Sequence, residues 1–263
     1  MAESNVILDA KNVTIRFGGL TAVSDFGLTI RDGELVGLIG PNGAGKTTIF
    51  NMLTGVYKPT EGEIRIGDHT TANMKPYQIT ARGVARTFQN IRLFKELTVL
   101  ENVQIGGHIH YKYSAGSAVL HTNRFYAAEQ VAEDEALRLL AIFGLQDRAL
   151  YLAKNLPYGD QRRLEIARAL AARPRLLLLD EPAAGLNTGE TLALMDKIHE
   201  IRDRFKVAVL LIEHNMELVM GICERIVVLN FGKTIAHGTP EQVRADPTVI
   251  EAYLGEPAQA AEA

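Results

Sequence analysis

Residues 40–48 have the types and spacing that bind phosphate groups. They read Gly-Pro-Asn-Gly-Ala-Gly-Lys-Thr-Thr and fit the pattern G-x-x-x-x-G-K-[ST] at every fixed position. The glycines let the backbone curl so that successive N–H groups point inward, and a following helix adds partial positive charge. Lys46 could reach the β- and γ-phosphates of a nucleotide, and the Thr47 hydroxyl could ligate Mg²⁺. The segment predicts a nucleoside triphosphate site; the alternative is a glycine-rich turn without a ligand.

Two adjacent carboxylates form the second chemical signal. Asp180 and Glu181 follow four consecutive leucines at 176–179, a pattern typical of a strand buried on both faces. Open α/β sheets place their ligands at this end of a strand. Asp180 suits a partner of Mg²⁺ through water, and Glu181 suits the residue that orients and deprotonates an attacking water. The alternative is an acidic turn with no function.

Alternating strands and helices must position these residues. The apolar run 35–39 predicts the strand before the phosphate loop, and 46–53 predicts the helix after it. The other predicted strands are 6–15, 22–30, 62–67, 176–179, 207–212 and 226–229, and the other predicted helices are 76–82, 125–143, 159–172, 187–205 and 216–223. Residues 84–94 show no regular pattern, and 108–123 predict a surface loop within a mainly helical region, 102–156.

Composition excludes several classes of protein. The chain has 263 residues and a net charge of −3, which argues against a nucleic-acid surface. The single cysteine, Cys223, excludes an intrachain disulfide framework and fits a reducing cytosol. Residues 1–5 lack the pattern of a signal peptide, and no apolar run approaches transmembrane length, so we expect no membrane span.

A third segment carries a resemblance to a known family. Residues 156–170 read Leu-Pro-Tyr-Gly-Asp-Gln-Arg-Arg-Leu-Glu-Ile-Ala-Arg-Ala-Leu and resemble the signature segment of ATP-binding cassette ATPases, whose usual form is LSGGQQQRVAIARAL. The phosphate loop and residues 176–182 stand in that family's order and spacing. Residues 86–94, 108–123, 180–187 and 251–256 are further similar to the ATPases of branched-chain amino-acid uptake.

The resemblance implies Mg²⁺-dependent ATP hydrolysis and gives roles to single residues. Gln89 is similar to the glutamine that senses Mg²⁺ and water, His214 to the histidine that contacts the γ-phosphate, and Phe17 to the aromatic residue that stacks on adenine. Taken singly, each has an ordinary structural alternative: a surface glutamine, a satisfied polar histidine or a core phenylalanine. The implied catalytic residues are Glu181, His214, Lys46 and Gln89, and the implied Mg²⁺ residues are Thr47, Gln89 and Asp180. The implied nucleotide contacts are Phe17, Val23, Gly40, Pro41, Asn42, Gly43, Ala44, Gly45, Lys46, Thr47, Thr48, Leu156, Pro157, Tyr158, Gly159 and Asp160.

Two positions depart from the broader family pattern. Pro157 replaces a serine whose hydroxyl contacts the γ-phosphate held by the opposite subunit. Backbone N–H groups at the start of the next helix could still bind that phosphate, since proline suits a first helical turn. Asn187 stands where an aspartate is common, in the loop that follows Glu181 and its proline. These departures bear on the rate and on communication between two sites, and leave the reaction type unchanged.

The alternation and the resemblance together predict the fold class α/β. The expected architecture is a phosphate-loop NTPase (RecA-like) core with an N-terminal antiparallel β subdomain and an inserted α-helical subdomain. Residues 1–256 would form one ATPase domain, with the helical subdomain at about 95–172 inserted in the core. Residues 257–263, which are low in sequence complexity, would form a disordered tail.

The family also implies partners and a location. Two ATP-binding subunits, identical or different, would close head to tail around ATP and drive two transmembrane permease subunits. An extracytoplasmic substrate-binding protein would act indirectly, no nucleic acid would be bound, and the chain would sit peripherally on the cytoplasmic face of the inner membrane. The alternatives are the ATPase of urea uptake or lipopolysaccharide export, a non-transport cassette protein acting on ribosomes or DNA, and a simple nucleotide kinase, which lacks the signature segment.

Overall fold

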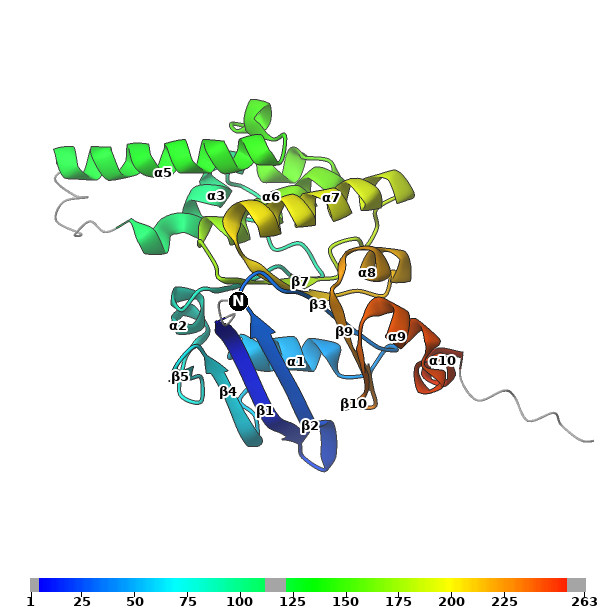
Figure 1. The fold of residues 1–263 in the computed structure, drawn as a ribbon. Coiled ribbons are helices and arrows are strands. Elements are labelled where there is room, and N and C mark those ends of the chain that lie inside the picture. The colour runs from blue at the N-terminus through cyan, green and yellow to red at the C-terminus, as the bar shows by residue number, and fades with distance from the viewer. Residues whose placement is uncertain (1–4, 112–121, 255–263) are drawn as a thin grey trace, which may run out of the picture. The chain divides into compact units, whose positions relative to one another are not determined.

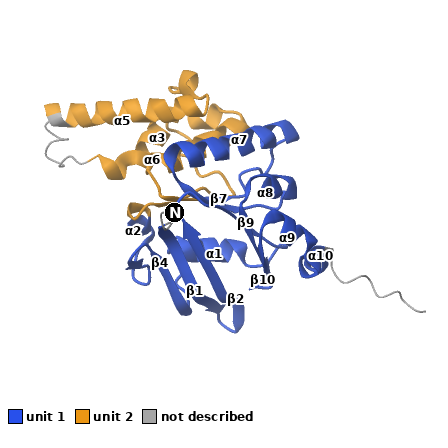
Figure 2. Cartoon of the chain, viewed as in Figure 1, with its two compact units in different colours: residues 1–79, 178–263 blue, residues 80–177 orange. Residues whose placement is uncertain are grey.

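The computed structural model describes residues 5–111 and 122–254 (Figure 1). They divide into two compact units, one formed by residues 1–79 and 178–263 and the other by residues 80–177 (Figure 2). The prediction of an inserted helical domain at 95–172 stays a prediction.

An antiparallel sheet opens the first unit. Its strands have the order β2-β1-β4-β5, with bounds β1 (Val6–Phe17), β2 (Leu20–Arg31), β4 (Glu61–Ile66) and β5 (His69–Thr70). Apolar residues of β1 and β2 point to one buried face, as Val13, paired with Phe26, illustrates. This sheet confirms the predicted antiparallel β subdomain.

A mostly parallel sheet forms the core of the first unit. Its strands follow the order β10-β9-β3-β8-β7, with bounds β3 (Leu35–Ile39), β7 (Leu176–Asp180), β8 (Ala208–Ile212), β9 (Arg225–Asn230) and β10 (Lys233–Gly238). Strand β3 pairs in parallel with both β8 and β9. Every residue of β3, β7 and β8 is buried, which explains their continuous apolar sequences. The α/β fold class is confirmed.

The described residues of the first unit form six helices, and three of them begin at a side-chain N-cap. Their bounds are α1 (Lys46–Leu53), α2 (Pro76–Ala81), α7 (Thr188–Phe205), α8 (Met216–Ile222), α9 (Pro240–Ala245) and α10 (Pro247–Leu254). Asn187 caps α7 by accepting the Glu190 N–H at 3.0 Å, in a reciprocal capping box. An asparagine at position 187 therefore has a local structural role.

The second unit is mainly helical. It contains β6 (Val84–Arg86), α3 (Val99–Gly107), α5 (Asn123–Ile142) and α6 (Tyr158–Ala171) with short 3-10 turns. Thr98 and Glu101 form a capping box at the start of α3. Asn102 is fully buried in α3, and its side chain bonds both the N–H and the carbonyl of Phe94. Asn102 thereby fixes the irregular segment that precedes the helix.

Several parts of the chain differ from the sequence prediction or lie outside the described residues. A short strand, β6, lies within the stretch expected to be irregular, and β10, α9 and α10 were not anticipated. Residues 108–110 of the predicted surface loop form a 3-10 turn, while 112–121 and the predicted disordered tail, 257–263, fall outside the described residues. The C-terminal elements escaped prediction because no residue of β10 is buried, and because α9 and α10 are too short to show a clear apolar period.

Candidate nucleotide site

The phosphate loop joins β3 to α1, as its sequence predicts. Gly40 has a φ of +151° and Gly45 a φ of +103°, in the range that favours glycine. A Cβ on Gly40 would lie 2.1 Å from the carbonyl oxygen of Leu229, and a Cβ on Gly45 would lie 3.0 Å from that of Ala22. The glycines are therefore required because the loop runs against the backbone of the two neighbouring strands.

Lys46 lies inside this loop. It is 7% exposed, and its ammonium donates to the carbonyl oxygens of Gly40 at 2.6 Å and Pro41 at 3.0 Å. Burial lowers the pKa of Lys46, whereas the carboxylates of Glu181 and Asp180 act in the opposite direction. Both carboxylates therefore contribute to the electrostatic environment of Lys46, although they are 134 or more positions away in sequence.

Asp180 is the last residue of β7, and Glu181 follows it directly. Asp180 is buried, while the Glu181 side chain is 18% exposed. Glu181 has a φ of +48°, an unfavourable backbone conformation for a side chain of this type, and its N–H donates to the carbonyl of Ile212 at 2.9 Å. Strained residues held by neighbouring structure concentrate at functional sites, so the backbone at Glu181 agrees with a functional role.

His214 approaches Glu181 from the end of the neighbouring strand, β8. Its Nδ1 lies 3.8 Å from Glu181 Oε2, and its side chain is 62% exposed. The two side chains face the same space. The structure therefore brings together the phosphate loop, both carboxylates and His214 within the first unit.

Glu213 is a structural residue that the sequence analysis missed. It is 1% exposed, and its carboxylate accepts N–H bonds from Ala183 at 2.7 Å, His214 at 3.2 Å and Asn215 at 3.4 Å. Burial raises the pKa of Glu213, and these backbone donors act to lower it. Glu213 thereby ties the segment after Glu181 to the segment that carries His214. A glutamate directly after a fully apolar strand is the signal that could have identified it.

The two predicted base contacts differ in exposure. Phe17, at the end of β1, is 44% exposed and packs edge-to-face on Tyr57 with 5.2 Å between ring centroids. Val23 is fully buried, and its Cγ2 lies 3.2 Å from the position of a Cβ on Gly45. The Phe17 ring is therefore partly exposed to solvent, whereas the Val23 side chain packs against the phosphate loop.

The signature segment begins α6 in the second unit. Pro157 is the N-cap residue, with no side-chain cap, and the helix begins at Tyr158. The Asp160 carboxylate in the first turn pairs with Arg148, and with Arg163 at 3.2 Å. Asp160 is thus engaged by two arginines of its own unit, and the backbone N–H groups are the donors that the helix start offers.

Gln89 also lies in the second unit, on an exposed segment after β6. Arg162 of the signature helix is 5% exposed and donates to the carbonyls of Phe88, at 2.8 Å, and Gln89. Glu165, which is also buried, accepts the Arg92 N–H at 3.2 Å and lies 3.6 Å from the Arg162 guanidinium. The signature helix therefore holds the backbone on both sides of Gln89, a link the sequence did not predict.

Two residues near the phosphate loop carry oxygen groups of the kind that Mg²⁺ binds. Within residues 5–111 and 122–254, no group of three or more His, Cys, Asp or Glu side chains could enclose a metal ion. Mg²⁺ commonly uses one or two protein oxygens together with phosphate oxygens and water. The buried Asp180 carboxylate near the loop and the Thr47 hydroxyl at the start of α1 have the hard-oxygen chemistry that fits it.

Fold and loop together define a phosphate-loop nucleotide-binding protein, and comparison with known proteins narrows the class. A family model described as "ABC transporter" matches residues 23–184. A second, described as "Branched-chain amino acid ATP-binding cassette transporter", matches residues 233–259. The chain therefore belongs to the ATP-binding cassette (ABC) transporter family, whose ATP-binding proteins hydrolyse ATP.

Three curated relatives align over almost their whole length. The high-affinity branched-chain amino acid transport ATP-binding protein LivG of Escherichia coli K12 is 50% identical over 253 residues, covering 96% of this chain and 99% of LivG. BraF of Pseudomonas aeruginosa, which has the same descriptive name, is 48% identical with the same coverage. The lipopolysaccharide export system ATP-binding protein LptB of E. coli K12 is 36% identical, covering 95% of this chain and 97% of LptB.

Solved structures of cassette proteins share the fold. The ADP conformation of MJ1267, an ATP-binding cassette of an ABC transporter, has a TM-score of 0.81 and 30% identity, covering 95% of this chain and 99% of MJ1267. The dimeric MJ0796 cassette bound to ADP and Pi has a TM-score of 0.75 and 27% identity, covering 89% and 99% of the two chains. No helix among the described residues of our chain has the length and apolar character needed to cross a membrane.

Proposed function

We propose that this chain is the ATP-binding subunit of an importer of branched-chain amino acids. The C-terminal match at 233–259 and the names of LivG and BraF support this substrate class. The lower identity to LptB makes lipopolysaccharide export the second candidate. The substrate itself would not touch this subunit, which supplies energy through ATP.

The observation that carries the mechanism is the meeting of Glu181, His214 and Lys46 at the phosphate loop. Lys46 would move from its carbonyl partners to the β- and γ-phosphates, and Phe17 would stack on the base. Glu181 would orient the attacking water and accept its proton, while His214 would contact the γ-phosphate. Glu181 suits this task because its carboxylate reaches the space beside His214, whereas Asp180 is buried at the strand end.

Mg²⁺ would be held by Thr47, Asp180 and Gln89, and when bound it neutralises charge on the phosphate oxygens. The Thr47 hydroxyl and the Asp180 carboxylate would supply protein oxygens. A change at Gln89 that depends on the bound nucleotide would affect the segment that follows Gln89, because Arg162 fixes the Gln89 backbone to the signature helix.

A second ATP-binding subunit would complete the site. The dimeric structure of the MJ0796 cassette supports the pairing of two such chains. We propose that the pair is head to tail, so that residues 156–160 of one chain would face the nucleotide of the other. Closure of the two ATP-binding subunits around ATP would drive two permease subunits. A substrate-binding protein would act on the outer side of the permease, and this chain would lie on the cytoplasmic face of the membrane.

Reconstitution tests both the reaction and its cargo. The chain is copurified with its membrane partners, placed in liposomes with the matching binding protein, and supplied with ATP on the side of the ATPase. We expect uptake of labelled leucine that requires Mg²⁺ and is lost in Lys46→Ala. Transport of urea or lipopolysaccharide instead would refute the proposed cargo, and leucine uptake without ATP consumption would refute the proposed reaction.

A further inference from the structure

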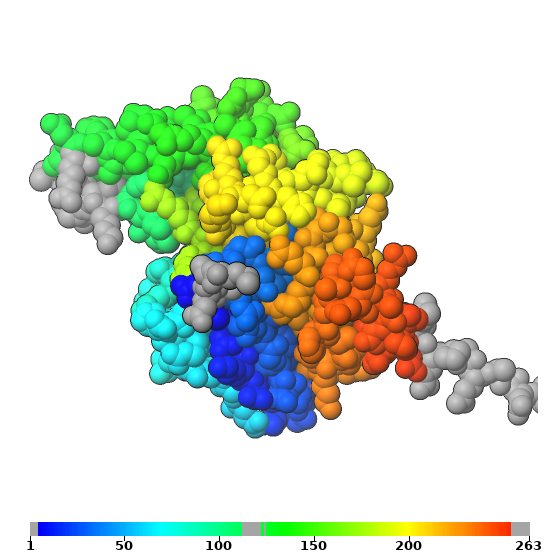
Figure 3. Space-filling view, in the orientation of Figure 1, coloured from blue at the N-terminus to red at the C-terminus, as the bar shows by residue number. Residues whose placement is uncertain are grey.

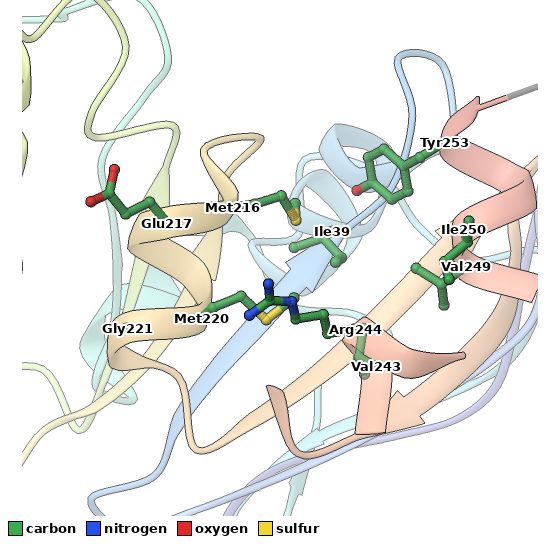
Figure 4. A pocket seen from close by; sticks show the side chains of 10 residues that line it. All are labelled: Ile39, Met216, Glu217, Met220, Gly221, Val243, Arg244, Val249, Ile250 and Tyr253. Atoms are coloured by element: carbon green, nitrogen blue, oxygen red, sulfur yellow. The ribbon is translucent and has the colours of Figure 1, made fainter. Parts of the chain in front are cut away.

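A cavity of about 760 Å³ lies among β3, α8, α9 and α10 of the first unit (Figure 4). We call it the C-terminal pocket because most of its walls come from residues 216–253. Figure 3 shows the C-terminal elements, coloured orange to red, on the surface of this unit. None of the nucleotide-site residues predicted from the sequence lines it.

The walls of the C-terminal pocket are mostly apolar. Met216 and Met220 project into it from α8, and Val249 and Ile250 face them from α10 (Figure 4). Ile250 is 45% exposed although it is a large apolar side chain. Flexible methionines adapt to ligands of irregular shape, so these walls suit an aliphatic chain.

One cationic group reaches the apolar walls. The Arg244 guanidinium extends from α9 to the side of Met220 (Figure 4), and no carboxylate among the described residues pairs with it. Glu217 borders the pocket, but Figure 4 shows its carboxylate turned away from Arg244. The charged group that a ligand in this pocket would meet is therefore a cation, which favours an anionic ligand over an amine or a zwitterion.

The size of the pocket bears on the length of the ligand. Pockets of roughly 300–1,000 Å³ hold drug-sized ligands, with apolar walls and a few placed polar groups. At about 760 Å³ the C-terminal pocket is in that range and exceeds what one amino-acid side chain needs. A carboxylate at Arg244 with an alkyl chain along the methionines would match both the charge and the volume.

The pocket also borders the nucleotide site. Ile39, in its wall, directly precedes Gly40 of the phosphate loop, and α8 starts two residues after His214, capped by Asn215. Burial of the Tyr253 hydroxyl raises its pKa, and a hydrogen bond with the Gly40 backbone acts in the opposite direction. Tyr253 and Ile39 line the same pocket, and they place its wall beside the first residue of the phosphate loop.

We propose that the C-terminal pocket binds an aliphatic carboxylate at Arg244 and that its occupancy is coupled through Tyr253 to nucleotide binding. The coupling is reciprocal, since a ligand that changes nucleotide affinity must itself bind with an affinity that the nucleotide changes. A free fatty acid and a branched-chain amino acid share this carboxylate chemistry, and the volume favours the longer chain.

Binding is tested on the full chain with its methionine methyl groups labelled with ¹³C for NMR. We expect hexanoate, octanoate and decanoate, each below its micelle concentration, to shift the Met216 and Met220 signals. Affinity should rise about fourfold for each added methylene. Saturation by leucine with no chain-length trend would identify the amino acid as the ligand and overturn the acyl-chain assignment. Absence of any shift would overturn the site.

Variants separate specific binding from partition into an apolar surface. Arg244→Met keeps an unbranched chain but removes the charge, and we expect at least a tenfold loss of decanoate affinity with unchanged affinity for decanol. Arg204→Met, on the exposed end of α7, is the matched control and should bind decanoate normally. Equal decanoate binding by Arg244→Met and the wild type would show that the carboxylate is not recognised.

The coupling is measured by titrating decanoate with and without a non-hydrolysable ATP analogue. We expect the two dissociation constants to differ at least threefold in the wild type and to be equal in Tyr253→Phe, which loses the hydroxyl that meets Gly40. The analogue's own affinity, titrated with and without decanoate, must change by the same factor. Equal wild-type constants, or undiminished coupling in Tyr253→Phe, would refute the link.

Discussion

The first prediction concerns Glu213, whose buried carboxylate holds the segments that carry Glu181 and His214 together. Glu213→Ala removes the acceptor of three backbone N–H groups, of which the Ala183 bond, at 2.7 Å, is short and the other two are at 3.2 and 3.4 Å. A buried donor left unpaired costs about 1–3 kcal/mol. Because the carboxylate is itself costly to bury, as its raised pKa shows, we expect a net loss near the cost of one such donor, about 2–3 kcal/mol.

That loss is large enough to measure by thermal unfolding. A change of 1 kcal/mol shifts the midpoint by about 2–4 °C in a chain of this size, so Glu213→Ala should melt roughly 5–10 °C below the wild type. Glu213→Gln keeps one acceptor oxygen for the Ala183 N–H and should lose about half as much. Glu251→Ala, at an exposed site in α10, is the control and should stay within about 0.5 kcal/mol of the wild type.

The pH dependence provides a second check. The folded-state pKa of Glu213 is raised, so its contribution to stability is present below the unfolded-state pKa and is lost as pH rises through the folded-state pKa. The destabilisation by Glu213→Ala should therefore be larger at low pH, within the range where the protein stays folded, than at high pH. Unchanged melting of Glu213→Ala, or a destabilisation that grows with pH, would refute this account of the carboxylate.

Three further predictions concern hydrolysis in the assembled transporter. Glu181→Gln should lower ATPase activity by ~10²–10⁴-fold, the range expected for loss of a general base, and should leave ATP affinity near normal. Near-normal turnover in this variant would refute Glu181 as the base and leave Gln89 and His214 as the candidates. Pro157→Ser should change the rate only severalfold, since it adds one hydrogen bond of about 1.5–3 kcal/mol less its desolvation, and total inactivation would reveal a conformational role. Arg162→Leu should reduce the stimulation of ATPase activity by the permease, and should reduce the affinity for ATP less. Arg163→Leu is the control for Arg162→Leu. If the two variants behave equally, Arg162 is excluded as the residue that holds the Gln89 backbone.

The sequence alone determined the parts of the protein that are local in the chain. The phosphate loop is one uninterrupted segment whose glycines and lysine have fixed spacing, and the strands beside it are unbroken apolar runs. The carboxylates of Asp180 and Glu181 were placed correctly at a strand end for the same reason. Because β7 is buried on both faces, its sequence contains four consecutive leucines, and this pattern can be recognised locally. These signals need no knowledge of distant residues.

Tertiary structure decided what depends on residues far apart. Three contacts each join positions separated by 30 or more residues: the approach of His214 to Glu181, the hydrogen bond from the Ala183 N–H to Glu213, and the hydrogen bond from Arg162 to the Gln89 carbonyl. No local pattern encodes them, because they arise only when β7 and β8, or α6 and the segment after β6, are brought to their places in the fold. The C-terminal pocket has the same origin: α8, α9 and α10 are short helices whose side chains acquire a common cavity only by packing beside β3.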